Sequence, residues 1–330
     1  MTNLAKFKKL KLAIVGCGNI ANFHVKAFKK AGINFSHCAA SLNSKNIKNF
    51  ASKNKIPNFW NNTIDLINSD HLWDGIVVCS STESIPEILD LIIKKDKPVL
   101  VEKPVSLGTN YLKKFKNKKN TKVLVAYNRR FYPTIEIAKK YVMQSNSQIL
   151  CNLRLPEQVP NLKKNKNKFR KVFENSSHGI DLLFYLFHNL SIKNNIKLNF
   201  NSFDSARLIN LKSLNNHQCV VTINSNSPDN FSLELDNGYK RLLLKPFEAY
   251  KVYEGIKITQ PSKAYPLRTF KPKIIKQGNI FDFDKTYKDI KPGFYEQATN
   301  FLNFIIDGNP GISSNLNISY KVQNLLEKIM

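Results

Sequence analysis

A chain of 330 residues, 42% hydrophobic and containing 22 Phe and 12 Tyr, has the composition of a folded protein of about two domains, which excludes an intrinsically disordered one. Its five cysteines are scattered without CxxC or zinc spacing, and no apolar run approaches the roughly 18 residues that span a bilayer, so we expect a cytoplasmic protein with reduced thiols and no membrane partner. The formal net charge of +27 suits nucleic acid, acidic lipid or phosphorylated substrates, but scattered lysines and scarce arginines favour a compositional origin.

The first 127 residues alternate short apolar runs with amphipathic stretches, as in a parallel sheet built from β-α-β units. Strands are predicted over residues 11–15, 33–40, 75–79, 99–102 and 122–127. Helices are predicted over residues 20–31, 45–53 and 84–95; Gly32 ends the first, and Pro86 lies in the first turn of the last. The sequence therefore predicts a first domain over residues 1–127 that contains a doubly wound parallel sheet.

Past residue 127 the pattern changes. A helix is predicted over residues 134–143, a strand over 148–155 and another helix over 176–187. From about residue 203 to 260, short alternating strands separated by polar turns such as Asp236-Asn237-Gly238 indicate a mostly antiparallel sheet. Two further helices are predicted near 295–307 and 318–330, and we assign residues 128–330 to a second α/β domain.

The first predicted strand and helix are joined by Gly16-Cys17-Gly18-Asn19-Ile20-Ala21, a GxGxxA sequence. Gly16 permits a tight turn, Gly18 lets a diphosphate approach the main chain, and Ala21 lets the helix pack closely on the sheet. Asn19 and Ile20 open the helix, whose N-terminal N–H groups attract phosphate. Because the β-α-β alternation continues afterwards, we expect a Rossmann domain that binds a nicotinamide dinucleotide rather than a merely structural glycine turn.

The residues after the second predicted strand bear on the choice between NAD and NADP. NAD is usually held by an acidic residue about twenty positions after the glycine turn. Here no carboxylate precedes Asp65, and the strand is followed by Ser41 and Asn43, with Lys45 nearby. Hydroxyl and amide groups beside a lysine accommodate a 2′-phosphate, so the sequence favours NADP. No arginine, the usual partner of that phosphate, is present there, which keeps NAD as the alternative.

Three further motifs follow in order: EKP at residues 102–104, AYNRRF at 126–131 and SHGIDLL at 177–183. With the glycine turn, they resemble the glucose–fructose oxidoreductase, inositol dehydrogenase and rhizopine-catabolism family, often called Gfo/Idh/MocA. The resemblance runs from about residue 10 to the end, and the segment GFY at 293–295 also looks like the family's C-terminal region. Four motifs in this order are jointly specific, whereas each alone is not.

The resemblance implies a second domain with a large open sheet for substrate binding and oligomerisation. It also implies hydride transfer between nicotinamide and a sugar-like secondary alcohol. The family's catalytic lysine falls on Lys103, and the histidine of its second-domain helix falls on His178. Two positions depart from the family pattern. The carboxylate four residues before the histidine, commonly Asp, is Glu174, and a frequent histidine after the fourth strand is Ile85.

The same residues suit the chemistry of alcohol oxidation, which needs a base for the hydroxyl proton and a group that favours the alkoxide. Lys103 is expected at the carboxyl end of a parallel strand, where such sheets bind ligands; an ordinary exposed lysine is the alternative. His178 is the candidate acid or base because imidazole titrates near neutrality. In a helix, Glu174 and Asp181 would share its face and orient it, although a histidine at a helix start is often structural. With a single histidine at ligand spacing, we expect no metal.

Polar residues after several predicted strands complete the expected cofactor site: Ser80, Thr82, Glu102, Asn128 and Arg129. Asn128 is also an expected substrate contact. The remaining histidines, including His24, show no partner pattern and are expected to be structural or exposed.

Six cations lie within residues 163–171, directly before the helix that carries His178. The expected substrate contacts among them are Lys163, Lys164 and Arg170. Most charge runs are solvated loops, but this position also suits a clamp on the diphosphate of a nucleotide-linked sugar.

We therefore predict an NAD(P)-dependent dehydrogenase or reductase for a sugar, sugar nucleotide or polyol, working as a homodimer or homotetramer. Two alternatives stay open: a glycoside hydrolase of the same family that retains its cofactor, and a non-catalytic nicotinamide-dependent regulator. A nucleic-acid partner is not expected, because no nucleic-acid-binding motif is present.

Overall fold

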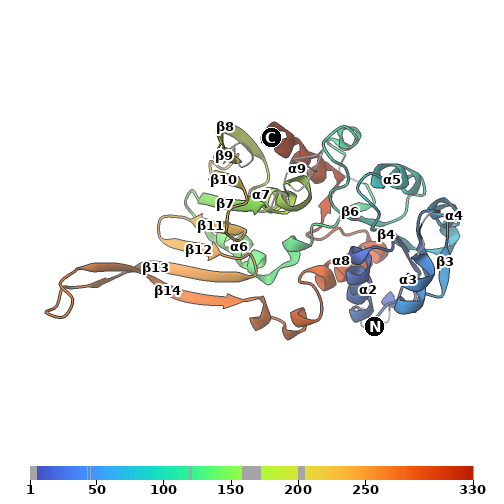
Figure 1. Cartoon of the computed structure of the whole chain (residues 1–330), viewed down its shortest axis with the longest axis horizontal. Helices are drawn as coiled ribbons and strands as arrows, with labels where there is room; N and C mark the ends of the chain where they lie inside the picture. Colours follow the sequence, from blue (N-terminus) through green and yellow to red (C-terminus); the bar gives the residue numbers. More distant parts are fainter. Residues whose placement is uncertain are drawn as a thin grey trace. The chain divides into compact units, whose positions relative to one another are not determined.

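The computed structural model describes residues 6–42, 44, 46–118, 121–157, 172–199 and 205–329. The chain forms two compact units (Figure 1). Unit 1 consists of Met1–Phe131 and Thr286–Lys328, and unit 2 consists of Tyr132–Lys285 with the last two residues. A single boundary is predicted at residue 127; in the structure the chain leaves unit 1 near residue 131 and returns to it near residue 286.

Unit 1 is built on a seven-stranded sheet in the order β15-β6-β5-β4-β1-β2-β3. The strands are β1 (Leu12–Val15), β2 (His37–Ala39), β3 (Asn58–Trp60), β4 (Gly75–Val78), β5 (Val99–Val101), β6 (Val123–Val125) and β15 (Ser314–Asn315). Neighbours from β6 to β3 are parallel, and β15 is antiparallel to β6. Strands β2 and β3 lie on one side of β1 while β4, β5 and β6 lie on the other, which is the Rossmann arrangement.

The helices of unit 1 are α2 (Asn19–Lys30), α3 (Ile47–Asn54), α4 (Thr63–Asn68), α5 (Ile85–Ile93), α8 (Phe294–Asp307) and α9 (Leu316–Ile329), of which α9 ends just past the unit. Single turns form η1 (Asp70–Leu72), η2 (Leu112–Phe115), η3 (Asn128–Phe131) and η6 (Lys285–Lys288). The predicted helices correspond to α2, α3, α5, α8 and α9. Strand β3 and helix α4 were not predicted, because each is too short for a periodic pattern; α4 is capped by the Asn62 side chain, which accepts from the Ile64 N–H at 3.0 Å.

Helix α8, far along the chain, completes the core of unit 1. The Phe28 ring of α2 meets the Phe301 ring of α8 edge to face, with centroids 6.2 Å apart. Both rings are buried in one apolar cluster with Leu12, Ile14 and Leu302. The return of the chain from unit 2 is therefore what closes this core.

Unit 2 is an eight-stranded sheet in the order β14-β13-β12-β11-β7-β10-β9-β8. Its strands are β7 (Leu150–Glu157), β8 (Leu190–Asn199), β9 (Ser205–Ser213), β10 (Gln218–Ser225), β11 (Ser232–Asp236), β12 (Lys240–Leu244), β13 (Ala249–Thr259) and β14 (Thr269–Asn279). Strands β7 and β10 are parallel, and the other neighbours are antiparallel. The predicted combination of a doubly wound parallel sheet and a mostly antiparallel one is confirmed.

One face of the unit 2 sheet is covered by α6 (Pro133–Gln144) and α7 (Ser177–Phe187) (Figure 1). Along β7, Leu153 and Leu155 are fully buried while Arg154 between them is exposed, which is the alternation of a sheet with one core face. Helix α7 packs closely on that face. A Cβ added at Gly179 would lie 2.5 Å from a Leu155 methyl carbon.

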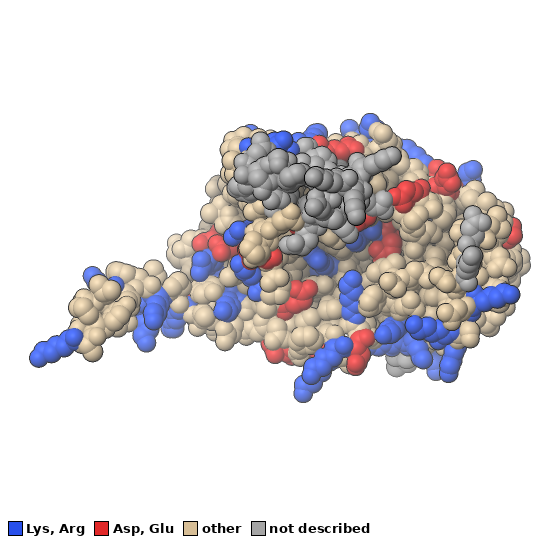
Figure 2. All heavy atoms as spheres, viewed as in Figure 1, with Lys and Arg blue, Asp and Glu red and all other residues tan. Residues whose placement is uncertain are grey.

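Within the part of the chain that the structure describes, no further strand lies beside the end of the β13–β14 hairpin. Pairing of β13 with β12 stops at Glu254, so residues 255–274, which we call the ribbon, extend as two strands only (Figure 1). The register places Ile256 opposite Pro272 and Ile258 opposite Phe270 on one face, with Lys257 opposite Lys271 on the other. Figure 2 shows basic side chains along this projection. Strand β14 was not predicted, because the expected strands stop near residue 260.

We predict that a buried hydrogen bond between α6 and the β12–β13 turn stabilises unit 2. The Thr134 hydroxyl, fully buried, donates to the Phe247 carbonyl at 2.6 Å. Thr134→Val keeps the shape but removes this donor, and should lower the free energy of unfolding by about 1–3 kcal/mol in urea titrations followed by circular dichroism. Ser147→Ala is the control: that exposed hydroxyl also donates to a carbonyl, of Asn237 at 2.9 Å, and its loss should cost less than about 0.5 kcal/mol. Equal losses would contradict the prediction.

Candidate functional site

The carboxyl ends of the parallel strands of unit 1 lie at one edge of the sheet. Gly16 follows β1, Ser80 comes two residues after β4, and Glu102 and Lys103 follow β5. The strand order changes direction between β1 and β4, which are neighbours with Val15 opposite Val78. Ligands of open α/β sheets bind outside the carboxyl ends of the strands at such a point.

Gly16 is required by the close approach of two main-chain segments. Its φ is 97°, and a Cβ there would lie 2.5 Å from the Cys79 carbonyl oxygen, so no larger residue fits. The Gly16 N–H donates to the Ala39 carbonyl at 2.8 Å, and the Cys79 N–H donates to the Val15 carbonyl at 2.7 Å. These contacts fix the turn from β1 into α2 against the segment that follows β4.

Gly18 is the N-cap of α2, and the space around it is open. Among the described residues, a Cβ at Gly18 would meet no atom within 4 Å and no side chain caps the helix, whose first turn contains no acidic residue. Uncapped N–H groups at a helix N-terminus attract an anion, because they add to the positive end of the helix dipole. Asn19 and Ile20 form the first turn, and Ala21, fully buried, lets α2 lie close to the sheet. The turn therefore fits a dinucleotide diphosphate.

The segment after β2 is where the second ribose of a dinucleotide would lie in a Rossmann fold. Ser41 is exposed there, and its carbonyl accepts from the Ser44 N–H at 2.9 Å. Asn43 lies outside the described residues. In the glycine turn, burial raises the pKa of the Cys17 thiol to about 11, so Cys17 is a thiol at neutral pH.

Glu102 ties the end of β5 to α2. One of its carboxylate oxygens lies 2.8 Å from Nε2 of His24, and the other accepts from the main-chain N–H of Lys103 at 3.2 Å. His24 is 1% and Glu102 7% exposed, while Lys103 is half-buried. The peptide bond that follows, between Lys103 and Pro104, is cis. His24, for which the sequence shows no partner pattern and which was expected to be structural or exposed, is buried and pairs with a predicted site residue 78 positions away.

The chain that returns from unit 2 also reaches this edge. The Asn128 side-chain amide donates to the Pro292 carbonyl at 2.9 Å, and Lys291 lies over the Phe23 and Phe294 rings, 5.3 and 5.4 Å from their centroids. Desolvation lowers the pKa of Lys291, the Glu102 carboxylate opposes this shift, and Arg129 adds to it. Lys291 was not predicted as a site residue, because no local motif marks it.

Ser80 and Thr82, after β4, are half-buried.

In unit 2 the predicted residues lie where α7 begins. His178 is buried, Asp181 is fully buried one helical turn later, and Glu174 is half-buried. Glu174 lies in a π-helical turn, η4 (Val172–Ser176), so the α-helical spacing assumed between Glu174 and His178 does not hold. Lys163, Lys164 and Arg170 lie outside the described residues.

A buried acid beside α7 was missed by the sequence analysis. Glu157, at the end of β7 and 2% exposed, accepts from the Ser176 hydroxyl and from the Asn175 amide at 3.3 Å. No local sequence pattern marks Glu157 as a buried acid, because its partners Ser176 and Asn175 lie nineteen and eighteen residues later.

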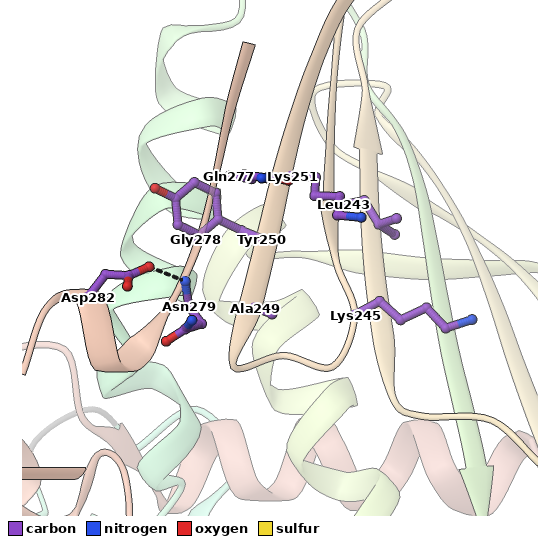
Figure 3. A pocket seen from close by; sticks show the side chains of 9 residues that line it. All are labelled: Leu243, Lys245, Ala249, Tyr250, Lys251, Gln277, Gly278, Asn279 and Asp282. Carbon is purple, nitrogen blue, oxygen red and sulfur yellow. Dashed lines mark hydrogen bonds between the residues drawn. The ribbon is translucent and has the colours of Figure 1, made fainter. Parts of the chain in front are cut away.

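Two hollows contain none of the predicted site residues. The first, about 540 Å³, lies at the base of the ribbon and is shown in Figure 3. There the Asp282 carboxylate accepts from the Asn279 N–H at 2.6 Å, and Lys245 pairs with Asp229 at 2.7 Å, so these charges serve local structure. The second, about 420 Å³, borders Pro98 and Lys122 just before β5 and β6, at the sheet edge opposite the glycine turn.

Two features are absent from the residues that the structure describes. No group of three or more His, Cys, Asp or Glu side chains there is arranged to hold a metal ion. Within the same ranges, no helix is both long and apolar enough to cross a membrane.

The chain matches one family model over part of its length and is similar in fold to several solved structures. Residues 10–143 match the Gfo/Idh/MocA sequence model, described as an oxidoreductase family with an NAD-binding Rossmann fold. No curated protein sequence matches the chain.

The similar solved structures span nearly the whole chain. A dehydrogenase (MviM) from Clostridium difficile has a TM-score of 0.73 at 20% identity over 98% of this chain and 99% of its own. A UDP-N-acetylglucosamine 3-dehydrogenase from Acidithiobacillus ferrooxidans scores 0.71 at 11% identity over 97% and 96%. A levoglucosan dehydrogenase in complex with NADH scores 0.74 at 15% over 97% and 95%. At these identities the structures establish the fold, and the family match confirms the resemblance noted from the motifs over residues 10–143.

The two glycines of the turn should respond differently to alanine. Gly16→Ala forces a Cβ onto the Cys79 carbonyl at positive φ, and should lower the melting temperature measurably. Gly18→Ala meets no protein atom, so the melting temperature should change little.

Gly18→Ala should nevertheless weaken NADH binding by roughly tenfold or more in fluorescence titrations, because its methyl group enters the space for the diphosphate. Unchanged affinity in Gly18→Ala would rule out diphosphate binding at this turn.

Proposed function

We propose that the chain transfers hydride between nicotinamide and a secondary alcohol or ketone of a sugar, sugar nucleotide or polyol, because residues 10–143 match the model of the Gfo/Idh/MocA oxidoreductase family with its NAD-binding Rossmann fold. The observation that carries this proposal is the position of Lys103. It follows β5 at the same sheet edge as the open N-terminus of α2, where a bound dinucleotide would be held.

The bound nicotinamide supplies the hydride acceptor or donor. Lys103 holds the reacting oxygen, since an ammonium favours the developing alkoxide in a partly dehydrated site. We assign the proton transfer to His178, whose intrinsic pKa range suits a general acid or base. Asp181, one helical turn after His178, and Glu174, in the π-helical turn before it, are proposed to orient the imidazole or balance its charge.

The cofactor is NADP or NAD. We favour NADP because the chain has no carboxylate before Asp65. No acidic residue in the segment around Ser41 would therefore repel a 2′-phosphate. The family is described as NAD-binding, and one similar structure contains NADH, which makes NAD the alternative.

A sugar nucleotide is the substrate class that best combines the available observations. One structure of similar fold is a UDP-N-acetylglucosamine dehydrogenase, and the six cations of residues 163–171 suit a diphosphate. A levoglucosan dehydrogenase of similar fold keeps a free sugar as the competing class. We place the reaction in the cytoplasm, where the five unbridged thiols would stay reduced.

The test is the change in nicotinamide absorbance with purified protein, NAD or NADP, and a panel of free sugars, inositols and nucleotide sugars. Turnover of nucleotide sugars alone is expected. Lys103→Ala should lower kcat by roughly 100-fold or more, because the group that favours the alkoxide is lost. Lys113→Ala, at an exposed lysine of η2, is the control.

Three outcomes would contradict the proposal. No turnover with intact NADH binding would favour a regulator. Hydrolysis of a glycoside with a cofactor that never exchanges would favour the hydrolase. Full activity in Lys103→Ala would remove Lys103 from the chemistry.

We also propose a homo-oligomer that uses the ribbon. Ile256, Ile258 and Phe270 on its apolar face are 63%, 47% and 58% exposed, and a two-stranded hairpin in water is marginally stable. Because Lys257 and Lys271 lie on the opposite face, a second copy can cover the apolar face without bringing the basic faces together.

Light scattering should therefore give the mass of a dimer or tetramer. Ile258→Lys should reduce that mass, since it places a charge on the apolar face. Thr259→Lys, the next residue and on the opposite face, should leave it unchanged. A monomeric parent protein would disprove the proposal.

A further inference from the structure

We infer that His24 is a positioning residue for Lys103, acting through Glu102; this inference rests on the proposed hydride transfer. His24 lies in the second turn of α2, whose N-terminus is the predicted diphosphate site, and Lys103 follows β5. The Glu102 carboxylate spans the two, with one oxygen toward His24 at 2.8 Å and the other toward the Lys103 N–H at 3.2 Å. The helix that would hold the cofactor and the residue that would hold the substrate are thus joined by one side chain.

The proton positions follow from the chemistry of the pair. An ionised carboxylate only accepts hydrogen bonds, so the His24 ring donates from Nε2 and the Lys103 main chain donates from its N–H. The His24 ring is held in turn by the Phe294 ring, whose centroid lies 4.9 Å away at a tilt of 57°. Each oxygen of the Glu102 carboxylate therefore accepts from a donor whose orientation is restricted.

Stability alone does not account for this pair. Helix α2 is already anchored by Ala21, Ala27 and Phe28, which are fully buried. Burying a histidine and a carboxylate removes both from water, and apolar residues of similar size stabilise a core as well or better. An apolar pair would lack the carboxylate that accepts from the Lys103 N–H. With the native pair, the His24 ring orients that carboxylate.

The consequence for the reaction is geometric. A misplacement of about 1 Å at a reacting group costs on the order of 100-fold in rate. Without His24, one oxygen of the buried Glu102 carboxylate loses its donor, the carboxylate is free to turn, and the Lys103 turn loses its fixed orientation.

The experiment compares His24→Leu, which removes the donor, with His24→Gln, whose amide nitrogen can replace Nε2. The first readout is hydrogen exchange of the Lys103 main-chain amide, followed by mass spectrometry in the absence of substrate. Exchange should be roughly tenfold faster in His24→Leu and near the parent rate in His24→Gln. His37→Gln is the control, since His37 is also a buried histidine of unit 1 and contacts Ser36 instead.

The second readout is steady-state kinetics with the compound of the substrate panel that the parent protein turns over. His24→Leu should lower kcat by roughly 10–100-fold with KM for the cofactor within about threefold, and His24→Gln should recover most of kcat. In a double-mutant cycle, Glu102→Gln should cost little more in the His24→Leu background than His24→Leu alone.

The outcomes separate this inference from the proposed function. Unchanged Lys103 exchange in His24→Leu overturns the inference even if the enzyme turns over. Equal loss in His24→Leu and His24→Gln, with equal falls in melting temperature, assigns His24 a structural role and also overturns it. If the parent protein shows no turnover, the proposed function fails, and the exchange data alone decide whether His24 fixes the Lys103 turn.

Discussion

The close approach of Gly16 to the main chain after β4 is the constraint on which the unit 1 site depends. A Cβ at Gly16 would lie only 2.5 Å from the Cys79 carbonyl oxygen, so the main chains that follow β1 and β4 are in close contact. This contact lies at the point where the strand order reverses. That contact directs the chain over the sheet edge into α2 and leaves the space at Gly18 open. The N-terminus of α2, the ends of β4 and β5, and the Glu102–His24 pair then share one edge of the sheet.

Much of the fold could be predicted because its signals are local. The β-α-β alternation up to residue 127 and the paired strands around Gly238 follow from patterns within a few residues, and α2, α5 and β12 lie close to their predicted positions. Strand β3 and helix α4 are shorter than the patterns that identify such elements. The ribbon was missed because alternating lysines are equally typical of a solvated loop. Nothing local could indicate that α8 packs on α2 rather than in the second unit, since that contact joins residues such as Phe28 and Phe301.

The same distinction holds for the candidate site. The glycine turn and the Glu102-Lys103-Pro104 segment are contiguous in sequence and were identified directly. The roles of His24, Lys291 and Glu157 depend on residues that are distant in the sequence. His24 and Glu102 are 78 residues apart, and the pKa of Lys291 depends on the charges of Glu102 and Arg129, which belong to a much earlier part of the chain. A lone histidine on an amphipathic helix carries no mark of its partner. The face shared by Glu174 and His178 was assumed from α-helical spacing, and the π-helical turn between them changes that geometry.

The return of the chain to unit 1 has a consequence for how the protein folds during synthesis. Residues 132–285 leave the ribosome as one continuous stretch and can form the antiparallel sheet as soon as they emerge. Unit 1 begins first but finishes last, because Phe301 and Leu302, which cover Phe28 and its neighbours, are made near the end of translation. Until then the apolar surface beneath α8 is uncovered and available to chaperones. Premature termination shortly after residue 285 would therefore yield a second unit that lacks only its last two residues, attached to a first unit that lacks part of its core.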